Sequence, residues 1–138
     1  MGRKIVMAAL LVVATAACER EADRQRLATE PQAVAIDPRP LIAEIVSVAA
    51  EPAPSGVILR ATGRAPVQGY YQGALLPVPS APGSLTFQFR AAQPTEAGRV
   101  STPRSREVTV ALALDTEELA GISELRVSGA TNALAVRR

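Results

Sequence analysis

From Leu41 onward, apolar and polar residues alternate with a period of two, the period of a β-strand that buries one face. The clearest segment is 84–91, in which apolar residues occupy every odd position from Leu85 to Ala91. Residues 108–114 alternate in the same way. The pattern predicts five further, weaker strands: 42–49, 57–62, 67–71 with an extension to 76, 124–128 and 133–136.

Turn-forming residues separate these segments at 52–56, 63–66, 77–83 and 130–132. Residues 115–119 are typical of a capped helical turn, with Asp115 or Thr116 as the N-cap and acidic side chains at the positive helix end. About seven short strands and one short helical turn predict an all-β fold, an antiparallel β-sandwich, over residues 41–138.

The number and spacing of the strands resemble those of immunoglobulin-like and fibronectin type III sandwiches. The Cys pair and the Trp that usually mark immunoglobulin domains are absent from this sequence. Only two Phe and two Tyr are present. We therefore expect a core of Val, Ile, Leu and Ala packed around Phe87 and Phe89.

The first 18 residues differ from the rest of the chain. Arg3 and Lys4 precede an uninterrupted run of apolar and small residues from 5 to 17, which ends at Cys18. A helix needs about 20 such residues to span a bilayer, so the run is too short to do so. The layout is that of an export signal with a small-residue cleavage site.

The segment Ala14-Thr15-Ala16-Ala17-Cys18 resembles the lipobox of bacterial lipoproteins, although position 15 usually carries Leu or another aliphatic residue. The resemblance implies cleavage before Cys18, acylation of its thiol by chains such as palmitate, and acylation of the new amino terminus. Two alternatives are an ordinary secretory signal that leaves a free thiol, and an uncleaved anchor. Stable anchoring takes two or more lipid chains, which a triacylated Cys18 would supply.

This resemblance also implies a location. Residues 1–17 would be a lipoprotein signal peptide, and the mature protein would be anchored in the cell envelope, facing the periplasm. Glu19 is not the Asp that often retains such lipoproteins at the inner membrane. The outer membrane is therefore expected rather than the inner one.

Residues 18–40 are predicted to form the lipidated Cys and a charged, flexible tether. Nine of the 22 residues from 19 to 40 are charged, and three prolines lie near the end of the segment. Such a composition offers too little apolar surface to offset the entropy of ordering. A flexible chain of this length has an end-to-end distance of about 25 Å.

Removal of the signal changes the charge of the protein. The full chain has 15 Lys and Arg against 13 Asp and Glu, and loss of Arg3 and Lys4 leaves 13 basic residues, all Arg. The mature chain is thus neutral. Nucleic-acid binding relies on clustered positive charge, so no nucleic-acid partner is expected.

The composition argues against most catalytic chemistry. The chain has no His and one Cys, which excludes His-based triads, His-based zinc sites and CxxC redox pairs. Glu117 and Glu118 are interpreted as surface caps, the glycines form no phosphate loop, and the serines lack a base once Lys4 is removed. We expect no enzymatic activity, no cofactor and no metal site.

Two features favour binding. Tyr70 and Tyr71 are adjacent aromatics in an aromatic-poor chain, and a strand would place one ring in the core and the other outside. The second feature is a 15-residue stretch, 92–106, that carries Arg99, Arg104 and Arg106. Loops this long are uncommon unless they are functional or disordered. The alternatives are that both rings cover the sandwich edge, and that the stretch is disordered or hides an edge strand.

The sequence therefore predicts a membrane-anchored envelope lipoprotein with a non-catalytic β-sandwich binding domain. Its partner is expected to be an envelope protein or a glycan. The alternative is a structural or assembly subunit of an envelope complex. An edge strand of the sandwich, which can pair with an incoming peptide strand, would suit either function.

Overall fold

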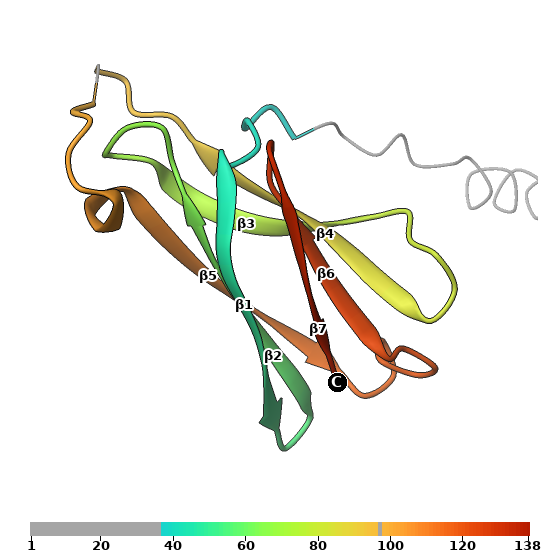
Figure 1. Ribbon diagram of the computed structural model, residues 1–138. Coiled ribbons are helices and arrows are strands. Elements are labelled where there is room, and N and C mark those ends of the chain that lie inside the picture. Colours follow the sequence, from blue (N-terminus) through green and yellow to red (C-terminus); the bar gives the residue numbers. More distant parts are fainter. Residues whose placement is uncertain (1–36, 97) are drawn as a thin grey trace, which may run out of the picture. The chain divides into compact units, whose positions relative to one another are not determined.

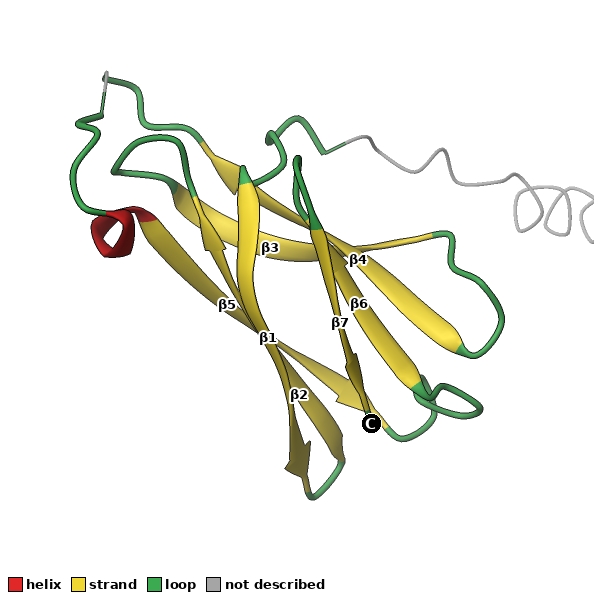
Figure 2. Cartoon of the chain, viewed as in Figure 1, coloured by secondary structure: helices red, strands yellow, loops and turns green. Residues whose placement is uncertain are grey.

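The computed structural model describes residues 37–96 and 98–138, which form seven strands and one 3₁₀ helix (Figures 1 and 2). The strands are β1 (Glu44–Ala53), β2 (Gly56–Arg64), β3 (Tyr71–Val78), β4 (Ser84–Ala92), β5 (Glu107–Asp115), β6 (Glu124–Ser128) and β7 (Ala133–Arg137). The 3₁₀ helix, η1 (Pro103–Arg106), leads into β5. The predicted signal peptide, Cys18 and the tether up to residue 36 lie outside the described residues.

The strands form two sheets, with the orders β1-β2-β5 and β3-β4-β6-β7. The predicted all-β sandwich of seven strands is confirmed. The prediction that it is antiparallel throughout is wrong for one pair, because β4 and β6 run parallel. A parallel pair requires a crossover connection, and β5 provides it by passing through the opposite sheet between β4 and β6.

The order of the second sheet differs from that of an immunoglobulin constant domain. There the third strand lies beside the sixth, and the fourth strand belongs to the other sheet. Here β4 lies between β3 and β6. The order β1-β2-β5 in the first sheet does match the immunoglobulin arrangement.

Several predicted boundaries were wrong, and β2 and β3 each continue two residues into a predicted turn, to Arg64 and Val78. The third strand begins at Tyr71 rather than at residue 67, because Gly69 adopts a φ of +91° that interrupts an extended strand. The first strand begins at Glu44 and runs to Ala53, through residues that were predicted to turn. Only Pro54 and Ser55 remain between β1 and β2, so the two strands form a tight hairpin.

The predicted cap at residues 115–119, after β5, is present, but this segment forms a hydrogen-bonded turn and not a helix. The Glu118 backbone N–H donates to Asp115 Oδ1 at 2.8 Å, and the Asp115 N–H donates to Glu118 Oε2 at 3.0 Å. This reciprocal pair is a capping box. The assigned helical turn is η1, where Thr102 caps the first residues.

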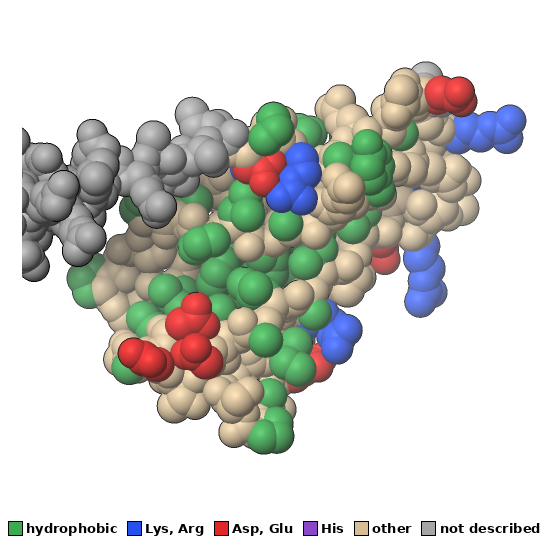
Figure 3. Space-filling model, turned by 180° about the vertical axis from the view of Figure 1, so that it is seen from behind, with side chains coloured by type: hydrophobic (Ala, Val, Ile, Leu, Met, Phe, Trp, Pro, Cys, Tyr) green, Lys and Arg blue, Asp and Glu red, His purple; other side chains and the backbone are tan. Residues whose placement is uncertain are grey.

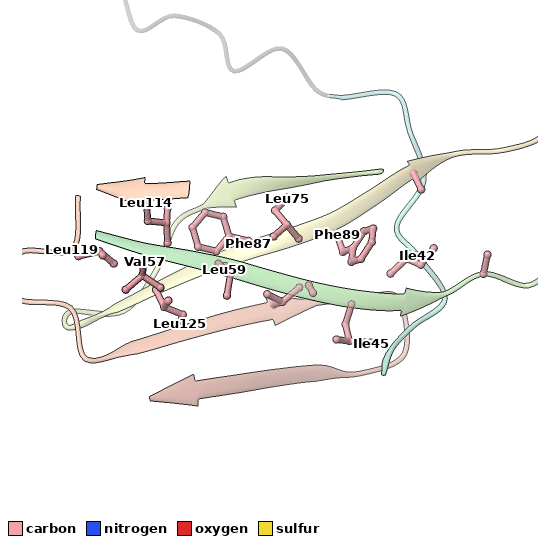
Figure 4. Close-up of a cluster of buried hydrophobic side chains, with 14 residues drawn as sticks. Ile42, Ile45, Val57, Leu59, Leu75, Phe87, Phe89, Leu114, Leu119 and Leu125 are labelled. Atoms are coloured by element: carbon pink, nitrogen blue, oxygen red, sulfur yellow. The ribbon is translucent and has the colours of Figure 1, made fainter. Parts of the chain in front are cut away.

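The core lies between the two sheets (Figure 4). Its largest fully buried side chains are Phe89, Ile42, Leu59, Leu119, Leu125 and Val127. Among the described residues no polar or charged residue is buried. The predicted aliphatic core around Phe87 and Phe89 is therefore confirmed.

Residues 40–42 pair with the end of β4 before the chain crosses to β1. The Ile42 N–H donates to the Phe89 carbonyl, and the Ala91 N–H donates to the Pro40 carbonyl.

Candidate binding surface

Two loops lie together at the end of the sandwich where the described chain begins (Figure 2). One comprises residues 65–70, between β2 and β3, and the other residues 93–106, between β4 and β5. The Gln68 N–H donates to the Arg99 carbonyl at 3.0 Å, and the Ala65 N–H donates to the Arg106 carbonyl at 2.9 Å. Backbone hydrogen bonds thus hold the two loops against each other.

Arg106 adds a side-chain link between the same loops. Its Nη1 donates to the carbonyls of Ala65 and Pro66, at 3.1 Å in each case. Its Nε is buried and has no hydrogen-bond partner. Of the three predicted arginines, Arg106 therefore holds the loop in place rather than presenting its charge outward.

Arg99 and Arg104 are exposed. No described residue accepts a hydrogen bond from either guanidinium group, so their N–H donors face solvent. Seen from behind, basic side chains project from the loop end of the molecule (Figure 3). Both arginines lie on a loop whose backbone is fixed at residues 99 and 106.

The two tyrosines have different environments, as predicted. Tyr70 is partly buried and packs against the core cluster, whereas residue Tyr71 is 49% exposed. Tyr70 precedes β3 and Tyr71 is its first residue, paired with Ala92 of β4. The pair thus gives the loop end one anchoring ring and one outward ring.

A hollow of about 310 Å³ separates the two loops beside Tyr70. It is lined by Val67, Tyr70, Gln93, Pro94, Thr95, Glu96 and Gly98. Gly98 makes the close approach of the loops feasible, because a Cβ there would lie 2.2 Å from the Gln68 carbonyl oxygen. The hollow is shallow and open, which suits a protruding side chain of a partner better than an enclosed small molecule.

The start of the described chain lies on the same end. Arg39 forms an ion pair with Asp37 and donates from Nη1 to the carbonyl of Gln72, next to Tyr71. Hydrogen bonds from Arg39 lower the pKa of the Asp37 carboxyl from 3.8 to about 2. Gln72 has a φ of +48° and lies where the pairing of β3 with β4 shifts register.

Sequence reasoning missed Arg64, which lines a second hollow of about 290 Å³ together with Arg106. Glu44, Arg64 and Glu107 lie in one row across β1, β2 and β5, and Arg64 forms ion pairs with both carboxylates. Arg64 could have been found only from the register of the strands, because the pairing of β2 with β1 and β5 is what brings these three charges together. With both carboxylates engaged, this row closes the end of the sheet rather than offering free charge.

The described residues, 37–96 and 98–138, contain no group of three or more side chains of the kinds that ligate metals. Among the same residues, no helix has the length and apolar character needed to cross a bilayer. Comparison of the chain with models of protein families, with curated proteins and with solved structures found no match.

Proposed function

We propose that the protein is a lipid-anchored envelope protein whose β-sandwich is a non-catalytic binding domain. In this proposal the loop end of the sandwich is the binding surface, with Tyr71, Arg99 and Arg104 as its contact residues. The partner is an envelope protein that presents acidic side chains to the arginines, and an anionic glycan is the other ligand class.

The anchor is supported by the sequence of the first 18 residues. The lone Cys of the chain stands directly after a small-residue pair and a short apolar run, which is where lipidation requires it. Membrane attachment through acylated Cys18, on the periplasmic face of the outer membrane, accounts for this arrangement. The following charged residues would let the domain stand off the membrane surface.

The hydrogen bonds between the two loops carry the binding proposal. Because the Gln68–Arg99 and Ala65–Arg106 bonds fix the backbone, Arg99 and Arg104 project from a supported loop. A preorganised surface loses less conformational entropy when it binds. Arginine and tyrosine are also the side chains most enriched among the residues that dominate interface energies.

The chain reaches the sandwich at the same end. Asp37 and Arg39 lie beside Gln72 and hence beside Tyr71. The proposed surface is therefore the part of the sandwich that follows the predicted tether directly. A partner held near the same membrane would be within reach of it.

The experiment is chemical crosslinking in intact cells, followed by purification of the full chain. Arg99→Ser combined with Arg104→Ser is expected to lose the crosslinked partner at an unchanged melting temperature. Arg126→Ser is the matched control, because Arg126 is an exposed arginine on β6 whose ion pair with Glu124 is local. Equal crosslinking in both variants would contradict the proposal.

The second candidate function is that of a structural or assembly subunit of an envelope complex. The nine-residue edge strand β5 favours it, since a strand edge suits permanent association. One stoichiometric partner in the crosslinking experiment would support a subunit. Several partners, or enrichment of glycan, would support a binding module.

A further inference from the structure

The two sheets have four edges in the described part of the chain: β1, β5, β3 and β7. An edge strand exposes unpaired backbone groups, and proteins usually protect it with a bulge, a proline, a charge or a very short strand. The four edges of this sandwich differ in that protection.

Three edges are protected. β1 has a register shift near Ile45, and the Asn132 side chain bonds to both the N–H and the carbonyl of Ile45. β3 has a register shift after Tyr71 and contains Pro77. β7 has only five residues and ends at Arg137.

The β5 edge has no bulge and no proline and is not short, and its two charges, Glu107 and Asp115, lie only at its ends. It pairs with β2 over nine residues without a register shift, and it contains no Pro or Gly. Residues 108–114 read Val-Thr-Val-Ala-Leu-Ala-Leu and include no charge. Such segments have a high tendency to pair with another strand.

Two hydrogen bonds at the ends of the β2–β5 ladder show which groups face the open edge. The Ala65 N–H donates to the Arg106 carbonyl, and the Thr116 N–H donates to the Ser55 carbonyl. Bonded and non-bonded pairs alternate in an antiparallel ladder, so the even-numbered residues of β5 bond to β2. Thr109, Ala111 and Ala113 therefore direct their N–H and C=O groups away from the sheet.

The start of β5 has Arg104 and Arg106 beside Glu107, which pairs with Arg64, whereas the charged residues at its end are all acidic. Arg104 lies before the strand, and Asp115, Glu117 and Glu118 lie at and after its end. Seen from behind, acidic side chains cluster at one end of the molecule while basic ones project from the other (Figure 3). Antiparallel pairing of two copies brings the basic end of one β5 beside the acidic end of the other.

We propose that β5 pairs with β5 of a second copy of this chain, in antiparallel orientation around a twofold axis. The two three-stranded sheets then become one continuous six-stranded sheet. A twofold contact uses the same surface on both copies and closes after two chains. This inference goes beyond the proposed function and does not depend on the anchor, although Arg104 belongs to both the loop surface and the dimer contact.

The charges also select the register. With Val110 on the twofold axis, Thr109 lies opposite Ala111 of the second copy, and their outward N–H and C=O groups bond. Arg104 then faces the second copy's Thr116, between two acidic residues. With Ala111 on the axis, Glu107 would lie directly opposite Asp115, and like charges across a strand pair are destabilising.

The test uses the full chain with Cys18→Ser, so that each further substitution introduces the only thiol. Under mild oxidation, Val110→Cys is expected to form a disulfide-linked dimer several-fold faster than Ala113→Cys. In this register the two Val110 residues are adjacent, whereas the two Ala113 residues are six positions apart, or about 20 Å. Ala113 is the more exposed of the two, so random collisions would give the reverse order.

A second pair of variants tests the backbone bonds. Ala111→Pro removes an outward N–H while leaving the even-numbered residues paired with β2, and it is expected to convert the dimer to a monomer in sedimentation equilibrium. Ala111→Ser, which keeps the N–H, is expected to stay dimeric. The inference is overturned by a monomeric parent chain at its highest soluble concentration, or by a dimer that survives Ala111→Pro. A monomer that captures a peptide strand along β5 would likewise overturn it.

Discussion

The Gln68 backbone nitrogen donates a hydrogen bond to the Arg99 carbonyl oxygen at 3.0 Å. The two residues are 31 positions apart in the chain (99 − 68), so this bond joins two separate loops. Gly98 permits the contact, because any side chain there would collide with Gln68. The bond uses only backbone atoms. The Arg99 side chain consequently has no structural role in it and is exposed.

Arg106 and Arg104 should differ in their effect on stability. Arg106→Ser removes two hydrogen bonds from a charged donor to the carbonyls of Ala65 and Pro66, and we expect it to lower the free energy of unfolding by about 1.5 to 3 kcal/mol. Arg104→Ser changes an exposed side chain and should stay within about 0.5 kcal/mol. Urea unfolding of both variants measures the difference. Equal effects would show that Arg106 does not hold the loops.

The core prediction concerns adjacent residues of β4. Phe87 is 3% exposed, and Phe87→Ala should cost about 3 to 5 kcal/mol of stability. Gln88 lies on the other face, where its Oε1 accepts two hydrogen bonds from Arg90, and Gln88→Ala should cost only about 1 kcal/mol. Total stability for such a domain is about 5 to 15 kcal/mol, so the Phe87 variant is best assayed by soluble yield and thermal melting. Similar, small effects at both positions would contradict the register of β4.

The ion pair at the start of the described chain should respond to acid. Because hydrogen bonds from Arg39 lower the Asp37 pKa from 3.8 to about 2, the folded state binds this proton less readily than the unfolded chain does. The stabilisation is fully present above pH 3.8 and is lost as the pH falls through about 2.

A carbon-detected NMR titration of the Asp37 carboxyl group measures this pKa directly. Arg39→Gln should raise the midpoint toward 3.8, and Arg126→Gln, far along the chain, should leave it unchanged. If the Asp37 titration midpoint does not change in Arg39→Gln, the Asp37–Arg39 ion pair does not form in solution.

The anchor prediction rests on Cys18. The mature protein should begin at this residue and carry fatty acid, so its intact mass should exceed that of the unmodified chain from 18 to 138. Cys18→Ser should abolish labelling with radioactive palmitate and cleavage of the signal before residue 18. An unmodified thiol at position 18 in the mature protein would refute the lipobox interpretation.

The strands that the sequence predicted well are those with strict alternation. Residues 84–91 and 108–114 correspond closely to β4 and β5, because each buries one face against the opposite sheet. The strand near Tyr71 was misplaced because its alternation is weak. Local conformation at Gly69 and Gln72 decides where it begins, and periodicity does not report backbone angles.

The sequence pattern could not predict which strands pair or in which direction. Alternation shows which face of β4 is buried but not that β6 lies beside it in parallel orientation. For the same reason the sequence grouped Arg99, Arg104 and Arg106 as equivalent, and only the folded positions of Ala65 and Pro66 separate Arg106 from the other two. The contrast between Tyr70 and Tyr71 was predicted from alternation along a strand, but Tyr70 lies before β3, so the predicted cause was wrong although the two exposures do differ.

Site-specific photocrosslinking in living cells tests the proposed binding surface most directly. A photoreactive phenylalanine analogue replaces Tyr71 in the full chain, and the matched control replaces Ala120, an exposed residue in the turn at the far end of β5. The proposal predicts a discrete crosslinked partner from position 71 that is absent from position 120 and is lost when Arg99 and Arg104 are changed to serine. Absence of a partner at position 71, or equal crosslinking from both positions, would contradict the proposal that the loop end is the binding surface.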